Sequence, residues 1–275
     1  MKKQKLIASI IKTIVICGLL CLYLVPFIFV VVNSFKESKD VTANPLALPA
    51  SFSFDNYIEA FKVMNYSNAF INTLIITVVS VAIIIICASM TAYIMVRRKW
   101  KITKYLFFLM VISMIMPFQA IMIPLVKIYG SIGMLNSKWA LMYMYLGFGV
   151  SLAVFMYHGF IKSIPLELEE AAMIDGATRL QTFWKIVFPL MKPTTMTIVT
   201  LDVLWIWNDF LLPSLVLISS EERTLQLSTY YFSGTYSVNY GLSMAGLMLS
   251  ILPVLIIYLF LQKGIIGGVL QGSIK

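Results

Sequence analysis

Six stretches of the chain are dominated by apolar side chains over lengths that reach across a lipid bilayer. A helix needs about 20 predominantly apolar residues to cross the hydrocarbon core. The pattern therefore predicts an all-α membrane protein in which residues 1–275 form a single transmembrane domain. The six transmembrane helices are expected over residues 13–32, 69–95, 105–126, 139–160, 191–218 and 242–262.

Polar and proline-containing segments separate or interrupt these stretches. Residues 33–68 contain no apolar run long enough to span, and we expect them to form a small cap outside the membrane. Pro117 and Pro124 lie inside the third stretch, where neighbouring helices can satisfy the freed carbonyl groups, so we expect the span to include both. A cleaved signal peptide is the alternative for the first stretch, but no A-x-A site follows it, so we expect a retained helix.

Composition narrows the class of protein. Hydrophobic residues make up 60% of the 275 residues and charged residues only 12%, whereas a soluble domain is about half apolar and a quarter charged. These values exclude a soluble globular protein and favour one membrane bundle without a separate soluble domain. Cys17, Cys21 and Cys87 lie in apolar stretches, so we expect small buried hydrophobes rather than disulfides or metal ligands.

Basic residues are distributed unevenly over the two sides of the membrane that six helices imply. One side holds 15 of the 21 lysines and arginines, in residues 1–12, 97–104, 162–192 and 263–275. Because cytoplasmic loops carry the excess of positive charge, we expect both termini and these loops in the cytoplasm. The net charge of +9 follows from this asymmetry and gives no reason to expect nucleic-acid binding.

Residues 163–193 combine clustered charge with helical patterning between two hydrophobic stretches. Pro165 suits the first turn of a helix, and Gly176 suits the left-handed position just after a helix end. Thr178 to Gln181 has the S/T-x-x-E/Q form of a capping box, which starts a second helix. The pattern predicts two short helices joined by a turn at the membrane surface.

The first of these two helices has a composition suited to contact with another protein. Glu169 and Glu170 lie near the positive end of its dipole and can pair with basic groups on a partner. Ala171 and Ala172 allow another surface to approach closely. An ordinary amphipathic hairpin at the membrane interface is the alternative.

The fifth apolar stretch carries polar residues that are costly inside a membrane. Asp202, Trp205 and Asp209 are spaced i, i+3, i+7, which would place them on one face of a helix. Intramembrane acids usually face a bundle interior or a wet cavity, and aromatic rings beside polar groups suit a sugar. We therefore expect a translocation path lined by Asp202, Trp205, Asn208 and Asp209. The alternatives are an interfacial aromatic belt around Asp209 and a helix-bonding role for Asp202.

Several motifs resemble a known family. Glu170-Ala171-Ala172, Gly176, Ile186, Phe188 and Pro189 match the E-A-A-x3-G-x9-I-x-L-P pattern of the EAA loop of ABC importer permeases, with Phe188 in place of the leucine. The segment from Trp207 to Pro213 resembles the W-N-D-F-x-x-P segment of the carbohydrate branch. Asn33 to Lys36 and Asp55 to Tyr57 also resemble that branch. The resemblance covers nearly the whole chain and points to the shorter membrane subunit of the maltose-type permeases.

The resemblance implies roles for two further sets of residues. In that family the EAA loop, here residues 163–189, is a cytoplasmic coupling helix that docks in a cleft of the ATPase subunit. The coupling residues would be Glu169, Glu170, Ala171, Ala172, Asp175 and Gly176. The last outer loop of such subunits contacts the sugar-binding protein, and its counterpart here is Ser233, Gly234, Thr235, Tyr236, Ser237, Val238 and Asn239. The C-terminal tail keeps Gln262, Lys263, Gly268 and Gly272 of the family pattern.

The resemblance also implies partners. It predicts a heterodimer with a second permease, two ATPase subunits and an extracytoplasmic sugar-binding protein, assembled in the cell (inner or cytoplasmic) membrane. The sequence has no G-x-x-x-x-G-K-[ST] motif, so ATP hydrolysis is expected on the partner subunits. This chain would then bind no cofactor or metal and would not itself be an enzyme, while ATP and Mg²⁺ would bind to the ATPases.

The sequence lacks the features typical of two other classes of membrane protein. A secondary sugar transporter often shows inverted repeats and broken midplane helices, and no convincing internal repeat is present. A membrane-embedded enzyme would need a constellation such as H-E-x-x-H, and the chain has one histidine. A permease of a related ABC importer for another small solute is a further alternative. The sequence favours half of the translocation pathway of an ATP-driven sugar importer, with an oligosaccharide as substrate.

Overall fold

The computed structural model describes residues 2–98, 100–230 and 239–273, and every regular element within these ranges is a helix. The all-α architecture expected from the sequence is confirmed. The helices are α1 (Lys2–Asn33), α2 (Ser38–Ala43), α3 (Asp55–Val63), α4 (Tyr66–Arg97), α5 (Lys101–Ile115), α6 (Phe118–Ser131), α7 (Lys138–Ile161), α8 (Glu167–Ile174), α9 (Arg179–Thr182), the π-helical turn η1 (Phe183–Val187), α10 (Phe188–Leu190), α11 (Lys192–Asn208), α12 (Leu211–Val216), the 3₁₀ turn η2 (Ser220–Glu222), α13 (Leu225–Thr229) and α14 (Tyr240–Ser273).

Four segments of these helices are long and apolar enough to cross a membrane within the described part of the chain: Ser9–Asn33, Tyr66–Arg97, Lys138–Ile161 and Tyr240–Phe260. Two bent helix pairs also pass the same test of length and composition, which gives up to six spans if each pair is one span. The chain is therefore a multi-pass membrane protein. It divides into two compact units, one formed by residues 1–67 and 228–253 and the other by residues 68–227 and 254–275.

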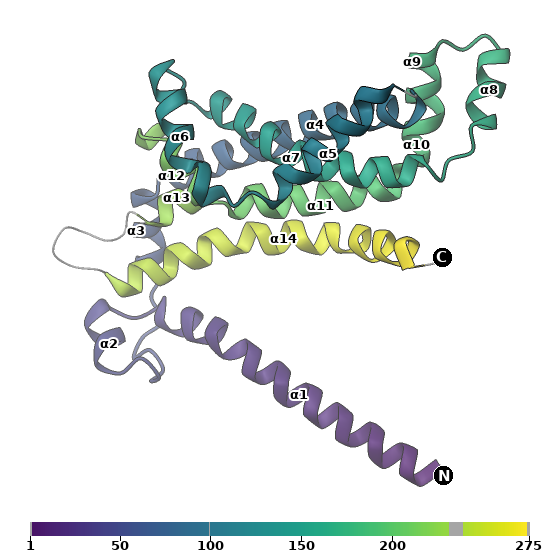
Figure 1. Ribbon diagram of the computed structural model, residues 1–275. Coiled ribbons are helices and arrows are strands. Elements are labelled where there is room, and N and C mark those ends of the chain that lie inside the picture. Colours follow the sequence, from purple (N-terminus) through teal and green to yellow (C-terminus); the bar gives the residue numbers. More distant parts are fainter. Residues whose placement is uncertain (1, 99, 231–238, 274–275) are drawn as a thin grey trace. The chain divides into compact units, whose positions relative to one another are not determined.

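The third apolar stretch is broken, which differs from the continuous helix expected there. α5 and α6 meet at an angle of 103° (Figure 1). Met116 precedes a proline and has an extended backbone, with φ −70° and ψ 120°, because the proline ring disfavours the helical conformation of the residue before it. Pro117 then becomes the N-cap of α6, whereas Pro124 is accommodated inside that helix.

The fifth apolar stretch is also shorter and more interrupted than expected. The helical segment Arg179–Leu190 bends by 75° into α11, which begins at Lys192 with Pro193 in its first turn. α11 ends at Asn208. The expected span to residue 218 is therefore interrupted by two non-helical residues, which are followed by the separate short helix α12. Prolines favour such breaks because they lack the N–H that continues a helix.

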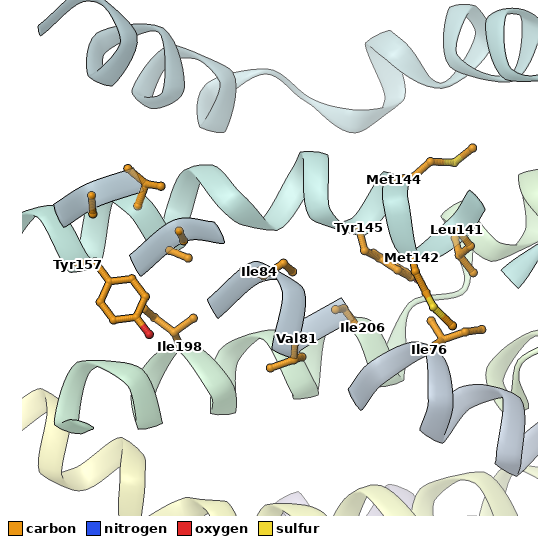
Figure 2. Packing of buried hydrophobic residues seen from close by; sticks show 14 of the residues in the cluster. Ile76, Val81, Ile84, Leu141, Met142, Met144, Tyr145, Tyr157, Ile198 and Ile206 are labelled. Carbon is orange, nitrogen blue, oxygen red and sulfur yellow. The ribbon is translucent and has the colours of Figure 1, made fainter. Parts of the chain in front are cut away.

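The core of the second unit is formed by α4, α7 and α11. Figure 2 shows side chains from all three helices, among them Ile84, Tyr145, Tyr157 and Ile206, and each of these four is at most 3% exposed. The Tyr157 hydroxyl donates to Thr195 Oγ1 at 2.9 Å, which satisfies a polar group inside this apolar packing. α7 also contacts α5, so it is packed on more than one face (Figure 1).

Gly149 lies where side chains of α4 and α11 come close to α7. A β-carbon at this position would lie 2.6 Å from Ile84 Cδ1 and 3.4 Å from Trp205 Cζ3. Small residues allow helix backbones to approach closely in membranes, where dispersion contacts replace the hydrophobic effect between helices. Gly149 therefore leaves room for the Ile84 side chain of α4 beside α7.

The histidine and the cysteines in the apolar stretches differ in how far they are buried. His158 stacks on Phe107 with ring centroids 4.0 Å apart, as expected for a packed histidine. Cys17 and Cys21 are exposed and Cys87 is half-buried, so the expected burial of the cysteines is wrong. The physical reason is that lipid is as apolar as a protein core, so an apolar side chain in a membrane helix need not face the core.

We predict that Gly149→Leu destabilises the bundle by about 1–3 kcal/mol, because the added side chain overpacks the contact with Ile84 and Trp205. The apparent melting temperature of the purified protein in detergent measures the effect. Gly147→Leu is the matched control, since a β-carbon at Gly147 meets nothing within 4 Å. Equal melting temperatures for the two variants would contradict the assigned packing.

Candidate functional site

The first helix of the predicted coupling segment ends in a well-defined cap. Gly176 has φ +86°, the left-handed conformation expected after the last helical residues. The Gly176 N–H donates to the Met173 carbonyl at 3.1 Å, and the Ala177 N–H donates to the Ala172 carbonyl at 2.9 Å. These two bonds form a Schellman motif, which satisfies carbonyl groups at the helix end. At the other end, α8 begins at Glu167, so Pro165 precedes the helix instead of occupying its first turn.

The second helix begins with the capping box expected from the sequence. The Gln181 N–H donates to Thr178 Oγ1 at 3.3 Å, and the Thr178 N–H donates to Gln181 Oε1 at 2.8 Å. α9 and α8 contact each other, as Figure 1 shows at one end of the unit. The turn through Gly176 thus joins two helices with defined ends.

The second helix does not continue in a regular α-helical register. η1 follows α9, and the Phe188 N–H donates to the Phe183 carbonyl in the π register. Pro189 has no N–H to donate to the Lys185 carbonyl, which weakens the α register at this point. π turns inside helices are frequent at functional sites. Here the π turn lies between the coupling segment and the bend into α11.

α8 presents different residues on its two faces. Glu167, Glu170, Ala171 and Ile174 are exposed, and the Ile174 side chain is 86% exposed. Glu169 and Ala172 are buried, at 2% and 7% exposure. The outer face therefore combines two acids, a small residue and a large apolar side chain, with Asp175 and Gly176 exposed at its end.

Glu169, one of the expected coupling residues, is buried and bonded within the chain. Its Oε1 atom forms an ion pair with Arg97 Nε at 2.7 Å, and its Oε2 atom accepts a hydrogen bond from the Tyr93 hydroxyl at 2.7 Å. Both carboxylate oxygens therefore have partners within the chain. Tyr93 and Arg97 were not identified from the sequence, although their i, i+4 spacing at the end of a span places them on one helix face.

A groove of about 390 Å³ lies beside this ion pair. α4, α8, α9 and η1 contribute its walls, together with residues that adjoin them. Its lining consists of Met90, Tyr93, Ile94, Arg97, Arg98, Leu166, Glu169, Met173, Arg179, Leu180 and Phe183. Apolar side chains and arginines therefore meet where the coupling segment joins α4.

The predicted path residues in and after α11 differ in their exposure. Asp202 is buried at 3% exposure, and its Oδ2 atom has no hydrogen-bond partner in the described part of the chain. Trp205 is 40% exposed and packs edge-to-face on Tyr145, with ring centroids 5.5 Å apart. Asn208 is exposed at the last position of α11.

Asp209 lies beyond the helix, so the i, i+7 argument that joined it to Asp202 is wrong. Its Oδ1 atom accepts from the Leu211 N–H at 3.0 Å, and its Oδ2 atom accepts from the Tyr145 hydroxyl at 2.9 Å. Asp209 therefore satisfies backbone and tyrosine donors at the break between α11 and α12. These contacts give it a structural role that its sequence spacing did not indicate.

The motifs of the predicted cap bond to one another within the first unit. Asn56 Nδ2 donates to the carbonyls of Ser34 and Lys36 at 2.9 and 2.8 Å, and the hydroxyls of Ser34 and Tyr57 lie 2.6 Å apart. The buried Lys36 ammonium donates to Asn33 Oδ1 at 3.1 Å and to the Asn44 carbonyl at 3.2 Å. The Asn33–Lys36 and Asp55–Tyr57 segments are therefore joined by hydrogen bonds.

The cap also meets the start of α14. The Tyr240 N–H donates to Ser38 Oγ at 3.2 Å, and a β-carbon at Gly241 would clash with the Lys36 carbonyl. Asn239 Oδ1 accepts from the Leu242 N–H at 3.1 Å and caps the helix. The other residues of the expected contact loop, 233–238, lie outside the described residues. Among the described residues, no group of three or more His, Cys, Asp or Glu side chains is placed to hold a metal ion.

Comparison with known proteins agrees with this arrangement of helices. Residues 80–268 match the family described as binding-protein-dependent transport system inner membrane component. The chain is 46% identical over 254 residues to the probable starch degradation products transport system permease protein AmyC of Thermoanaerobacterium thermosulfurigenes, covering 92% of each chain. It is 36% identical to the multiple sugar-binding transport system permease protein MsmG of Streptococcus mutans, covering 100% of each.

A solved structure shares the fold. A chain of a bacterial ABC transporter involved in the import of the acidic polysaccharide alginate superimposes with a TM-score of 0.79 at 25% identity, covering 94% of this chain and 96% of that one. The chain belongs to the binding-protein-dependent transport system permeases, the membrane components of ABC importers whose ATP hydrolysis takes place in a separate subunit.

Proposed function

We propose that this chain forms half of the translocation pathway of an importer for an oligosaccharide. The observation that carries the substrate class is the agreement among its relatives. Their names describe starch degradation products, multiple sugars, and melibiose, raffinose and stachyose. The last of these relatives, MelC of Bacillus subtilis, is 36% identical over 99% of this chain. The other half of the pathway is a second permease.

The outer face of α8 is proposed as the contact with an ATPase. Glu170 and Glu167 offer negative charge to basic groups on the partner, and Ala171 leaves room for its backbone. Ile174 is exposed on the same face, and burial of such a side chain is worth about 1.5–3 kcal/mol. Glu169 and Ala172 act differently, because they hold α8 against its own unit. Asp175 and Gly176 set the direction of the chain as it leaves α8.

The translocation path is proposed to include Trp205 and Asn208, the exposed members of the predicted set. An aromatic ring and a carboxamide suit the apolar faces and hydroxyl groups of a sugar. Asp202 is buried in the packing between helices and would shape the path from there. Asp209 fixes the end of α11 by accepting a hydrogen bond from the Tyr145 hydroxyl. The side chains that meet the sugar would then differ from those that shape the path.

The side of the membrane on which each remaining partner lies follows from the orientation of this chain. We propose that the termini and α8 face the cytoplasm of a cell whose inner membrane holds the complex, because the basic residues are concentrated on that side. The two ATPases bind ATP and Mg²⁺ there, and this chain binds no cofactor. Residues 233–239 contact the sugar-loaded binding protein on the outer side.

The substrate proposal predicts ATP-dependent sugar uptake by the assembled transporter. The four kinds of subunit should be purified together, reconstituted in proteoliposomes and supplied with maltotriose or raffinose as probes. Uptake should require both ATP and the binding protein, and ATP hydrolysis should rise when the loaded binding protein is added. Uptake driven by an ion gradient without ATP would overturn the proposal, and uptake of a non-sugar solute alone would overturn the substrate class.

The orientation proposal predicts opposite labelling of two exposed positions. Lys101→Cys and Leu48→Cys should be placed separately in a background that lacks Cys17, Cys21 and Cys87. In intact cells with a permeable outer layer, an impermeant maleimide should label position 48 directly and position 101 only after the inner membrane is opened. Direct labelling of both positions would contradict the orientation.

The coupling proposal predicts that Gly176→Val weakens transport without preventing assembly. A side chain at φ +86° costs about 1–2 kcal/mol, and the relaxed backbone would reorient α8 relative to α9. Apart from its chain neighbours, no atom of the described residues lies within 4 Å of an added β-carbon, so the expected cost comes mainly from the backbone conformation. Uptake and sugar-stimulated ATP hydrolysis should both fall.

Gly176→Asn is the matched control for this prediction, because asparagine adds a β-carbon but tolerates the left-handed conformation. It should retain most of the uptake of the unmodified transporter. A Gly176→Val complex with full stimulation and full uptake would show that the turn does not transmit movement from the ATPase.

A further inference from the structure

A buried ion pair joins the last turn of α4 to α8. Arg97 Nε lies 2.7 Å from Glu169 Oε1, and the two side chains are 16% and 3% exposed. The same guanidinium donates through Nη2 to the Ile164 carbonyl at 2.9 Å. Arg97 therefore binds two parts of the coupling segment, the Ile164 carbonyl before α8 and Glu169 within α8. Because the guanidinium is planar, its N–H groups point in fixed directions, and the two bonds fix both partners at once.

Tyr93 extends this contact to the second helix of the segment. It lies one turn before Arg97 and donates to Glu169 Oε2 at 2.7 Å. Its ring also packs against Phe183 in η1, with centroids 5.1 Å apart. The end of α4 thus contacts the chain before α8, the first turn of α8, and the helix after the Gly176 turn.

The opposite end of α4 is held by a second set of polar contacts. Asn72 Nδ2 donates to the carbonyls of Glu221 and Arg223 at 2.7 and 3.2 Å, and Asn72 Oδ1 accepts from Lys138 Nζ at 3.0 Å. Between the two ends, the buried Ile76 and Ile84 pack in the core with α7 and α11. Asn72 and Arg97 are 25 residues apart in one uninterrupted helix, a distance of about 38 Å, so α4 connects the two sets of contacts without a break.

We infer that Arg97 is a positioning residue that fixes α8 to α4, so that a displacement of the coupling segment moves α4 with it. This inference rests on the proposed docking of an ATPase on α8, but the attachment itself is a property of this chain. Arg97 need not touch the ATPase or the sugar. Its role is to hold Glu169, and through it α8, in one orientation relative to the bundle.

The attachment can be measured without ATPase activity or sugar. In the assembled transporter in lipid nanodiscs, nitroxide labels would be placed at Val78→Cys on α4 and Leu168→Cys on α8, in a background without Cys17, Cys21 and Cys87. Both native side chains are exposed, at 57% and 45%, and neither belongs to the face of α8 proposed to contact the ATPase. Pulsed electron paramagnetic resonance should give one narrow distribution of label-to-label distances when Arg97 is present. The distribution should be broad or shifted for Arg97→Ala.

Arg98→Ala is the matched control, because it removes the same charge from the next residue. Arg98 is exposed and lies over the Trp100 ring, 5.7 Å from its centroid, instead of binding Glu169. Its distance distribution should match that of the unmodified protein. An unchanged distribution for Arg97→Ala, or equal broadening for Arg98→Ala, would overturn the inference.

A functional readout separates positioning from general stability. The amount of maltotriose or raffinose taken up per ATP hydrolysed should fall about tenfold or more in Arg97→Ala, because loss of the buried ion pair releases α8 from α4 while the ATPases can still hydrolyse ATP. Arg98→Ala should stay within about twofold of the unmodified ratio, as surface charges contribute little. If the unmodified transporter shows no ATP-dependent uptake, the proposed function fails, while the distance measurement still decides the attachment.

Two further variants cover the case in which Arg97→Ala does not assemble. Arg97→Lys keeps the charge but lacks the planar fork that binds Glu169 and the Ile164 carbonyl together, so its distribution should be broader than that of Arg98→Lys. Arg97→Met with Glu169→Leu replaces the ion pair by apolar packing and should give a narrower distribution than Arg97→Lys. Equal distributions for all of these variants would overturn the role of Arg97.

Discussion

Packing of α7 against α11, with the Ile84 side chain of α4 beside Gly149, is the constraint on which the arrangement of the second unit depends. A β-carbon at Gly149 would lie too close to Ile84 Cδ1, so a larger residue there requires the Ile84 side chain to move, whereas Trp205 lies at ordinary contact distance. Both polar contact sets of α4 are positioned by this packing. Asn72 meets the residues around Glu221 near one end, and Arg97 meets Glu169 at the other. A shift of α4 along its axis would break both sets at once, so the apolar core fixes the register of the polar ends.

Breaks between helices determine where the coupling segment and α11 begin and end. Backbone groups in a membrane must find partners within the protein, so a chain changes direction only where other groups replace the lost helical bonds. The π turn before Pro189 and the bend before Pro193 separate the coupling segment from α11. At the far end of α11, the Asp209 carboxylate takes the Leu211 N–H and the Tyr145 hydroxyl where the helix stops. An acid that is costly in a membrane is thereby stabilised by the break that it caps.

The first unit uses polar contacts to organise a short loop region. Lys36 is buried without a carboxylate partner in the described part of the chain, and carbonyl and amide oxygens bind its ammonium group instead. Because the Lys36 carbonyl is in turn bound by Asn56, the Asn33–Lys36 and Asp55–Tyr57 segments stabilise each other. Gly241 is required beside them for steric reasons, which ties the start of α14 to the same cluster. The residues that resemble the carbohydrate branch are therefore the ones that hold this cluster together.

The sequence by itself determined the features that depend on neighbours within a few residues. Apolar runs gave the membrane class, the Thr178–Gln181 capping box began the second coupling helix, and Gly176 closed the first. Tertiary structure decided which prolines break a helix: Pro117 does, whereas Pro26, Pro124 and Pro253 lie inside helices. It also decided that Glu169 faces inward, because its partner Arg97 is 72 residues away, and that Asp209 binds Tyr145, 64 residues away. A cap or a helix end is fixed by bonds to adjacent residues, whereas the burial of a charge is stable only when distant parts of the chain bring its partner to it.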